Sequence, residues 1–310
     1  MHDEFSTPIT VEDKKESLIH LYVDGGLNRR EVVTRLAKLL GGTGAAMAAL
    51  QTAGLGQVVQ QACPDNIKVG ENDPAIQWEN VMFPGDGFTM RGLLARPKNQ
   101  TDAQPAVLVV HENRGLVEHI RDVTRRAAKA GFVALGIDLL SRQGGTEAFP
   151  DDTTRGAAYG RTLQPERYND MYMAIEYLQR QSFVVWDRIG AVGFCAGGGN
   201  ILHGVYNKMP LQAAVPFYGT PPANPLPGDV TTPVLCIYSD TDRNQALRIA
   251  DVANSFVTSR NTFGIHVLKG TGHGFHNDTG AVYNPAAACE AWARTIEFFN
   301  IHLRAPRATA

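Results

Sequence analysis

A cysteine stands between two glycines in the segment Gly193-Phe194-Cys195-Ala196-Gly197. This pattern, a nucleophile with a glycine two residues before it and another two residues after it, is typical of a sharp turn between a strand and a helix. The small residues let the two elements approach each other. The N-terminus of the following helix would direct free N–H groups and a partial positive charge at the sulfur, which lowers a thiol pKa and stabilises an oxyanion. Cys195 is therefore predicted to be a nucleophile.

A thiol nucleophile needs a proton acceptor, and the order of residues after Cys195 offers one. In hydrolases built on a strand-to-helix nucleophile turn, the chain order is nucleophile, acid, base. The acids that follow a later apolar stretch are Asp240 and Asp242, and the histidines in the next glycine-rich loop are His273 and His276. His273, flanked by glycines, is the favoured base, and His276 is its rival. The spacing alone leaves both acids open as the group that orients the imidazole.

The segment that follows residues 105–111 supplies the third element of the site. In this arrangement the loop there donates the second oxyanion N–H group, next to that of the residue after the nucleophile. The backbone N–H groups of Asn113 and Ala196 are the candidates. Glu112 is unusual beside a developing oxyanion, so we expect it to face the sulfur and accept the thiol proton. The alternative is a structural ion pair of Glu112 with Arg114 or Arg121.

The same residues could be read as a ligand site, but the patterns argue against it. The glycines around Cys195 lack the Gly-Lys-Ser/Thr ending of a phosphate loop, and no acid about 20 positions later suggests a ribose partner. A metal site from His111, Glu112, His273 and His276 does not match the helical His-Glu-x-x-His pattern. We therefore expect no metal and no cofactor.

Five segments together resemble the dienelactone hydrolase family, the carboxymethylenebutenolidases. They are H-E-N-R-G-L, I-D-L-L-S-R, G-F-C-A-G-G-G, Y-S-D-T-D and G-T-G-H-G-F, and the likeness covers about residues 75–303. The resemblance implies an α/β-hydrolase fold and hydrolysis of a small ester or lactone through an acyl-thioester. A general short-chain esterase or thioesterase, or a non-catalytic ligand-binding homologue, are the alternatives.

The resemblance also implies roles for single residues. It identifies Cys195 as nucleophile, selects Asp242 with His273 as its partners, and makes Glu112 the residue that helps to form the thiolate. Arg142 matches a family arginine that binds the substrate carboxylate. A second family arginine lies four residues after the histidine, where this chain has Asn277. The charge of the substrate therefore stays open.

The elements that must position these residues alternate between strands and helices. Residues 75–97 read as a hairpin with a glycine-containing turn. Buried strands are expected over 105–111, 132–138, 188–194, 213–218, 233–238 and 265–268. Helices are expected over 117–130, 165–181, 243–258 and 285–302. This alternation predicts a mainly parallel sheet with helices on both faces.

The first 65 residues differ from the remainder because they are helix-like and lack strand patterns. We expect an N-terminal helical arm over 1–65 and a catalytic domain over 66–310. Arg29 and Arg30 precede a mildly apolar segment, which is also the pattern of a twin-arginine export signal. Apolar residues near helical spacing favour an arm that is retained in the mature protein, and a protein that retains it is expected to be cytoplasmic. If the segment is a working export signal, the protein is expected to be periplasmic. The arm could also form a homodimer.

Composition limits the remaining classes. Apolar residues make up 44% and charged residues 19%, as in ordinary globular proteins, and the formal net charge is −2. That charge argues against nucleic acid or an anionic membrane as the main partner. No Cys-x-x-Cys pair is present, and Cys236 and Cys289 read as small buried hydrophobes. A small-molecule substrate is the expected partner.

Overall fold

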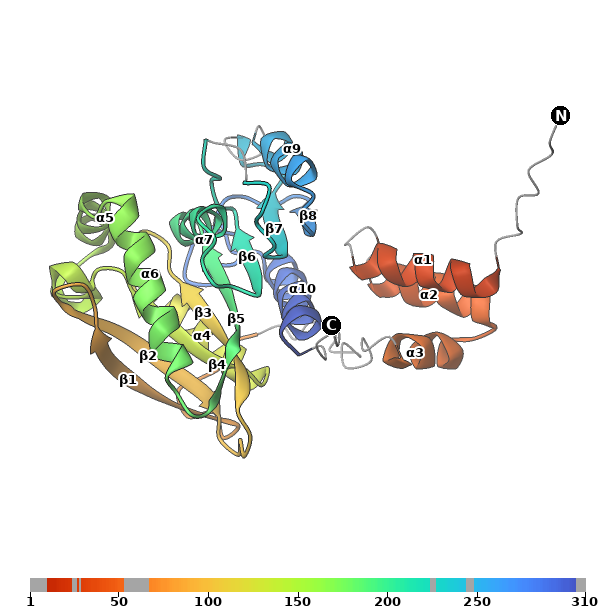
Figure 1. Ribbon diagram of the computed structural model, residues 1–310, viewed down its shortest axis with the longest axis horizontal. Helices are drawn as coiled ribbons and strands as arrows, with labels where there is room; N and C mark the ends of the chain where they lie inside the picture. Colours follow the sequence, from red (N-terminus) through yellow and green to blue (C-terminus); the bar gives the residue numbers. More distant parts are fainter. Residues whose placement is uncertain are drawn as a thin grey trace. The chain divides into compact units, whose positions relative to one another are not determined.

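The computed structural model describes residues 10–23, 27, 29–52, 67–223, 227–243 and 248–304. The chain divides into two compact units, residues 1–61 and 62–310, whose elements are labelled in Figure 1. Each unit is described by itself. Within the described residues, no helix combines the length and the apolar character needed to cross a bilayer.

Three helices form the described part of the N-terminal unit: α1 (Val11–Val23), α2 (Arg29–Leu40) and α3 (Thr43–Thr52). Val32 and Leu36 lie one turn apart on α2 and are fully buried, as their helical spacing predicts. Tyr22, Leu27, Ala46 and Leu50 are buried as well. The described residues of the arm are thus largely helical, while the arm as a unit over 1–65 and its role in export or dimerisation stay predictions.

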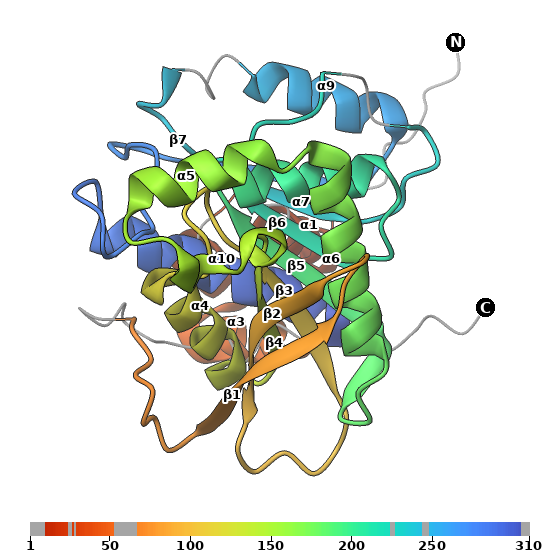
Figure 2. The same ribbon diagram turned by 90° about the vertical axis from the view of Figure 1, so that its left-hand side faces the viewer.

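An eight-stranded sheet forms the centre of the second unit, in the order β1-β2-β4-β3-β5-β6-β7-β8. Its strands are β1 (Ile76–Pro84), β2 (Thr89–Pro97), β3 (Gln104–Val110), β4 (Val133–Asp138), β5 (Val184–Phe194), β6 (Ala213–Phe217), β7 (Val234–Ser239) and β8 (Phe263–Leu268). Strands β1 and β2 form an antiparallel hairpin, and β2 also pairs antiparallel with β4 (Figure 2). The six strands β3 to β8 run parallel to one another. This is the α/β-hydrolase arrangement that the sequence predicts.

Helices cover both faces of the sheet, and each face has its own apolar core. The helices are α4 (Glu118–Lys129), α5 (Asp152–Arg161), α6 (Gln164–Gln179), α7 (Ala196–Tyr206), α9 (Ile249–Ser259) and α10 (Pro285–Arg304). Residues of α5, α6, α7 and α9 pack with one face, and residues of α4 and α10 with the other. Parallel strands place their carboxyl ends at one edge, where α/β proteins build their sites.

Two features of this unit differ from the sequence analysis. Helix α5 was not expected, because its segment contains Gly156 and Gly160 and has no apolar stripe; Asp151 begins it by accepting a hydrogen bond from the Thr154 N–H group at 2.8 Å. Cys289 is buried, as expected, but it is disulfide-bonded, which its interpretation as a small apolar residue did not include.

Candidate active site

Cys195 occupies a strained turn between β5 and α7. Its φ of 52° lies in the left-handed region, which is costly for a residue with a side chain. A Cβ atom built on Gly193 would lie 2.5 Å from the carbonyl oxygen of Gly197. One built on Gly197 would lie 2.4 Å from the carbonyl oxygens of Val110 and His111. Glycine at these two positions therefore allows the helix to begin directly against the ends of β3 and β5.

Cys195, His273 and Asp242 lie in one hydrogen-bonded series. The Nε2 atom of His273 is 2.9 Å from the Cys195 sulfur, and its Nδ1 atom is 2.6 Å from Oδ2 of Asp242. Because a carboxylate oxygen only accepts, the proton belongs on Nδ1, and Nε2 is left to accept from the thiol. The His273 side chain is 42% exposed, and that of Asp242 is 11% exposed. A base in contact with solvent thus faces the candidate nucleophile.

The resting sulfur is a thiol. Burial raises the pKa of Cys195 to about 11, and the charge of Glu112 acts in the same direction; the Ala196 N–H group and the Arg114 guanidinium act against them. The expected effect of the helix N-terminus is therefore present but is outweighed by burial. A thiol of this pKa reacts at neutral pH only if a neighbouring group takes its proton.

The two rivals from the sequence occupy other positions. Asp240 accepts a hydrogen bond from the Thr271 N–H group at 3.1 Å, so its carboxylate stabilises a loop instead of the imidazole. His276 is fully buried between Phe194 and Phe217, with ring centroids 4.9 and 5.1 Å away. Neither side chain is hydrogen-bonded to His273 or Cys195 in the described part of the chain.

Glu112 is buried and bonded to an amide. Its Oε2 atom accepts a hydrogen bond of 2.9 Å from the Asn277 side chain, whose own oxygen accepts from Thr279. The proposed ion pairs of Glu112 are absent among the described residues: Arg114 pairs with Asp152, and Arg121 donates to Asn80. A carboxylate with a neutral partner is therefore held close enough to Cys195 to raise its pKa.

The predicted oxyanion groups belong to the residues that directly follow Cys195 and Glu112. The Ala196 N–H group is the first of α7 and is hydrogen-bonded to the Cys195 side chain, an interaction that lowers the thiol pKa. The Asn113 N–H group forms no hydrogen bond within the described residues. His111 fixes the start of this loop, because its ring donates to the Glu112 carbonyl and accepts from the Leu139 N–H group at 2.9 Å.

Comparison with known proteins identifies the family of this chain. The family model for the dienelactone hydrolase family matches residues 90–303. The chain belongs to the dienelactone hydrolase family. The resemblance seen in the sequence is thereby confirmed.

Relatives with assigned activities agree with that membership. A Salmonella typhi protein assigned as a carboxymethylenebutenolidase is 30% identical over 249 residues, which cover 73% of this chain and 88% of the relative. A Bradyrhizobium protein assigned as a 2-oxo-3-(5-oxofuran-2-ylidene)propanoate lactonase is 29% identical over 242 residues, covering 74% and 95%. A crystal structure assigned as a dienelactone hydrolase from Klebsiella pneumoniae superposes with a TM-score of 0.66 at 27% identity, covering 73% of this chain and 98% of that one.

Arg142 of this dienelactone hydrolase family member is engaged by protein groups. Its guanidinium forms two hydrogen bonds, of 2.8 and 3.1 Å, with the buried carboxylate of Asp170, and lies over the ring of Phe88. None of these partners belongs to the Cys195 series. Its predicted role in substrate binding therefore gains no support from its contacts.

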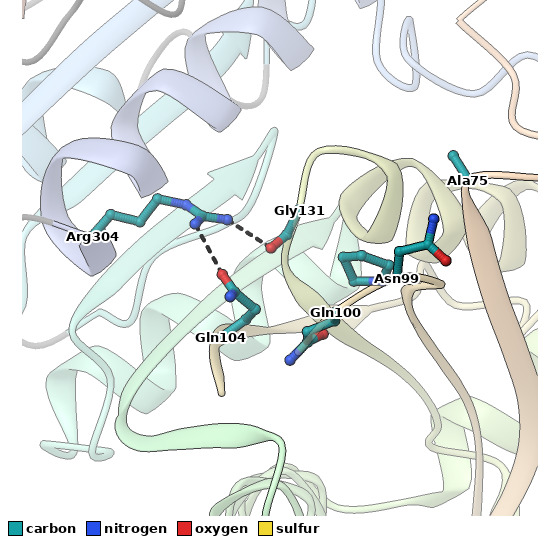
Figure 3. Close-up of a pocket in the computed structure, with 7 residues that line it drawn as sticks. Ala75, Asn99, Gln100, Gln104, Gly131 and Arg304 are labelled. Atoms are coloured by element: carbon teal, nitrogen blue, oxygen red, sulfur yellow. Dashed lines mark hydrogen bonds between the residues drawn. The ribbon is translucent and has the colours of Figure 1, made fainter. Parts of the chain in front are cut away.

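A polar pocket lies at the opposite edge of the sheet (Figure 3). Its residues precede β1, end β2, begin β3 and precede β4, away from the carboxyl ends of the parallel strands. Arg304 donates there to Gln104 at 3.1 Å and to the carbonyl of Gly131 at 2.6 Å. These contacts join the end of α10 to the sheet, and the pocket contains no nucleophile or base.

The sequence analysis missed one side of the site. The hydroxyl of Tyr159 in α5 accepts from Asn200 of α7 at 2.8 Å, and its ring makes an edge contact with that of His111, with ring centroids 6.0 Å apart. Helix α5 is thus tied to the helix that begins after Cys195. Its capping residues D-D-T-T were the only sequence signal. No cluster of potential metal ligands occurs among the residues described.

Proposed function

We propose that the chain hydrolyses a small carboxylic ester or lactone, with Cys195 as nucleophile, His273 as general base and Asp242 as the group that orients it. The series of 2.9 and 2.6 Å contacts supports this most directly. Family membership supports the reaction class, and the relatives assigned as a carboxymethylenebutenolidase and a lactonase support the kind of substrate.

The first half of the reaction makes an acyl-thioester. His273 Nε2 takes the thiol proton, and the sulfur attacks the carbonyl carbon of the substrate. The carbonyl oxygen becomes an oxyanion, which the N–H groups of Ala196 and Asn113 stabilise. As the intermediate collapses, the leaving alkoxide takes the proton from His273. In a lactone the released hydroxyl stays in the same molecule.

The second half returns the enzyme to its resting state. A water molecule gives a proton to His273 and attacks the thioester carbon. The carbon–sulfur bond breaks, and Cys195 recovers its proton from the imidazole. The half-exposed position of His273 supports this step, because water reaches the base without a movement of the loop. Asp242 stabilises the imidazolium in both halves.

Glu112 is proposed to assist the first proton transfer. While it is charged it opposes the thiolate, as the raised pKa of Cys195 indicates. If Glu112 first takes the thiol proton and then passes it to His273, its charge and that opposition disappear together until His273 holds the proton. The hydrogen bond from Asn277 holds the carboxylate in place for this without neutralising it, which an arginine at that position would do.

The test uses p-nitrophenyl acetate and two cysteine variants. Cys195→Ala should abolish turnover, and iodoacetamide should add one carbamidomethyl group to the folded native protein, at Cys195. Cys236→Ser is the matched control, because Cys236 is fully buried with a pKa raised to about 12 and should not react. Unchanged hydrolysis by Cys195→Ala would refute the proposal.

A neutral short-chain ester is the second candidate substrate. It is favoured by one observation: Arg142 is bound to Asp170, and Asn277 stands where a second family arginine is expected. A panel of neutral esters and anionic lactones, measured as kcat/KM, separates the two classes.

A further inference from the structure

We propose that Arg114 selects substrates by charge, binding a carboxylate of the ester or lactone at the entrance beside Cys195. This inference rests on the proposed function, because it names the substrate class of the same site. The substrate carboxylate would then be bound by a cation at position 114, and not at position 142 or 277, where the family resemblance places its arginines.

The position of Arg114 follows from the loop after β3. It comes two residues after Glu112 and directly after Asn113, and both of these belong to the candidate site. The guanidinium favours the thiolate of Cys195, so its charge is felt at the sulfur. Gly115 follows with a φ of 82°, a conformation that glycine adopts readily.

The ion pair of Arg114 leaves much of its side chain available. Its Nη1 atom is 2.9 Å from Oδ2 of Asp152, and the two side chains are 49% and 51% exposed. Exposed pairs of this kind contribute little to stability, so an incoming carboxylate can replace Asp152 at small cost. Asp152 also accepts from Arg155 at 3.2 Å, which means that one carboxylate faces two guanidinium groups. Asp152 therefore keeps Arg155 as a partner when a substrate carboxylate takes its place at Arg114.

Asp152 belongs to the first turn of α5, and this helix lies against the same loop. A Cβ atom at Gly156 would be 3.8 Å from the side-chain nitrogen of Asn113. Further along, Tyr159 is hydrogen-bonded to Asn200 of α7, so α5 is held at both the loop and the nucleophile helix. Arg114 and Asp152 therefore join two elements that border Cys195.

Other arginines near the site are committed to the protein. Arg142 is held by Asp170, whose carboxylate is fully buried. Arg167 donates to Asn200 at 3.3 Å and to the backbone carbonyls of Tyr159, in α5, and Thr162, which directly follows α5. Removing either from such partners would leave buried acceptors unpaired, which costs more than opening an exposed pair.

Alkylation of Cys195 by reagents of different charge tests the proposal without requiring hydrolysis. Iodoacetate is anionic and iodoacetamide is neutral, so the ratio of their rates reports the charge at the entrance. Any change in the thiol pKa affects both rates and cancels in the ratio. Arg114→Gln should lower the ratio on the order of fivefold. Asp152→Asn should raise it, because it removes the competing carboxylate.

Arg180→Gln is the matched control. Arg180 is also an exposed arginine in a single carboxylate pair, with Glu176 at 2.9 Å, but it lies at the end of α6. In Arg180→Gln the ratio of the iodoacetate rate to the iodoacetamide rate should equal that of the native protein within experimental error. An unchanged ratio in Arg114→Gln, or equal decreases in Arg114→Gln and Arg180→Gln, would overturn the proposal.

Hydrolysis then connects the charge to the substrate. The p-nitrophenyl ester of glutaric acid is anionic, and p-nitrophenyl butyrate is its neutral counterpart. In Arg114→Gln the ratio of KM for the anionic ester to KM for the neutral ester should rise about fivefold. If the native protein hydrolyses neither ester but the alkylation ratio still changes, the proposed function fails while the cationic entrance stands. If hydrolysis occurs and neither ratio changes, the role of Arg114 fails alone.

Discussion

The two ends of the loop after β8 carry chemically similar residues and behave in opposite ways. At one end, His273 is half exposed and bonded at both ring nitrogens, to Cys195 and Asp242. At the other end, His276 is fully buried, and neither ring nitrogen has a hydrogen-bond partner within the described structure. The candidate base and the core side chain are thus only three positions apart in the sequence.

Asp278 explains how the buried end stays in place. Its carboxylate lies 3.1 Å from Nδ1 of His119 and 3.0 Å from the guanidinium of Arg126, both on α4, and 3.3 Å from Lys68. Asn277, directly after His276, donates to Glu112. The ion pairs of Asp278 therefore help to hold the loop that carries His273 and the amide that binds Glu112. In this loop, hydrogen-bond partners and contact with solvent distinguish the reactive end, whereas burial distinguishes the supporting end.

Removing the imidazole of the reactive end should have the largest effect. In His273→Ala the base is lost, and kcat/KM for p-nitrophenyl acetate should fall about a thousandfold. The thiol then titrates with its own raised pKa, so iodoacetamide alkylation should increase about tenfold per pH unit from pH 7 towards about 11. A variant that keeps native turnover would erase the distinction between the two ends of the loop.

Removing the orienting charge should have the next largest effect. Asp242→Asn keeps the size of the side chain but favours the wrong tautomer of His273, and kcat should fall about a hundredfold or more. Asp240→Asn is the matched control, since Asp240 accepts from the Thr271 N–H group and has no contact with the imidazole. Larger loss in Asp240→Asn than in Asp242→Asn would reverse the assignment of the acid.

The sequence predicts the reactive end better than the supporting end, for physical reasons. Glycines at 193 and 197 are required by contacts under 3 Å, so the turn at Cys195 leaves a local pattern. The burial of His276 depends on Phe194, Phe217 and α4, which come from distant parts of the chain. A loop histidine has no periodicity that could report such burial.

Long-range pairing also explains what was missed at the entrance. The partner of Arg142 is 28 residues away, on the buried side of α6, and no local motif predicts that contact. Helix α5 was missed because two glycines and few apolar residues conceal it, and without α5 there is no Asp152 to pair with Arg114. Residues that act through backbone strain were thus predictable, whereas residues defined by tertiary partners were not.

Weakening the anchor should lower stability before it lowers activity. Interactions with His119 and Arg126 overcome the effect of burial and hold the pKa of Asp278 at about 2, below the ordinary value of 3.8. A group with a lowered folded pKa stabilises the protein above its unfolded pKa, and loses that contribution as the pH falls towards 2. Asp278→Asn should therefore cost about 2 kcal/mol at pH 7, and the difference from native should shrink below pH 4. Urea unfolding at several pH values measures this. A constant difference at all pH values would show that the charge of Asp278 is not involved.

Replacing the buried histidine should have the smallest effect at neutral pH. His276 lies among the rings of Phe194, Phe217 and Trp292, and burial holds its pKa well below the ordinary value of 6.5. His276→Phe removes two unpaired polar atoms and keeps an aromatic ring, so stability at pH 8 should change by less than about 1 kcal/mol and turnover should persist.

The pH dependence gives this last variant its decisive test. In the native protein the folded state keeps His276 neutral, while the unfolded chain takes up a proton below about pH 6.5, so stability falls as the pH falls. The phenylalanine variant lacks that proton uptake. It should become progressively more stable than native below pH 6.5, by about 2 kcal/mol at pH 5. The opposite trend, a native protein stabilised by acid through this residue, would mean that His276 is charged in the fold and that the loop has two working histidines.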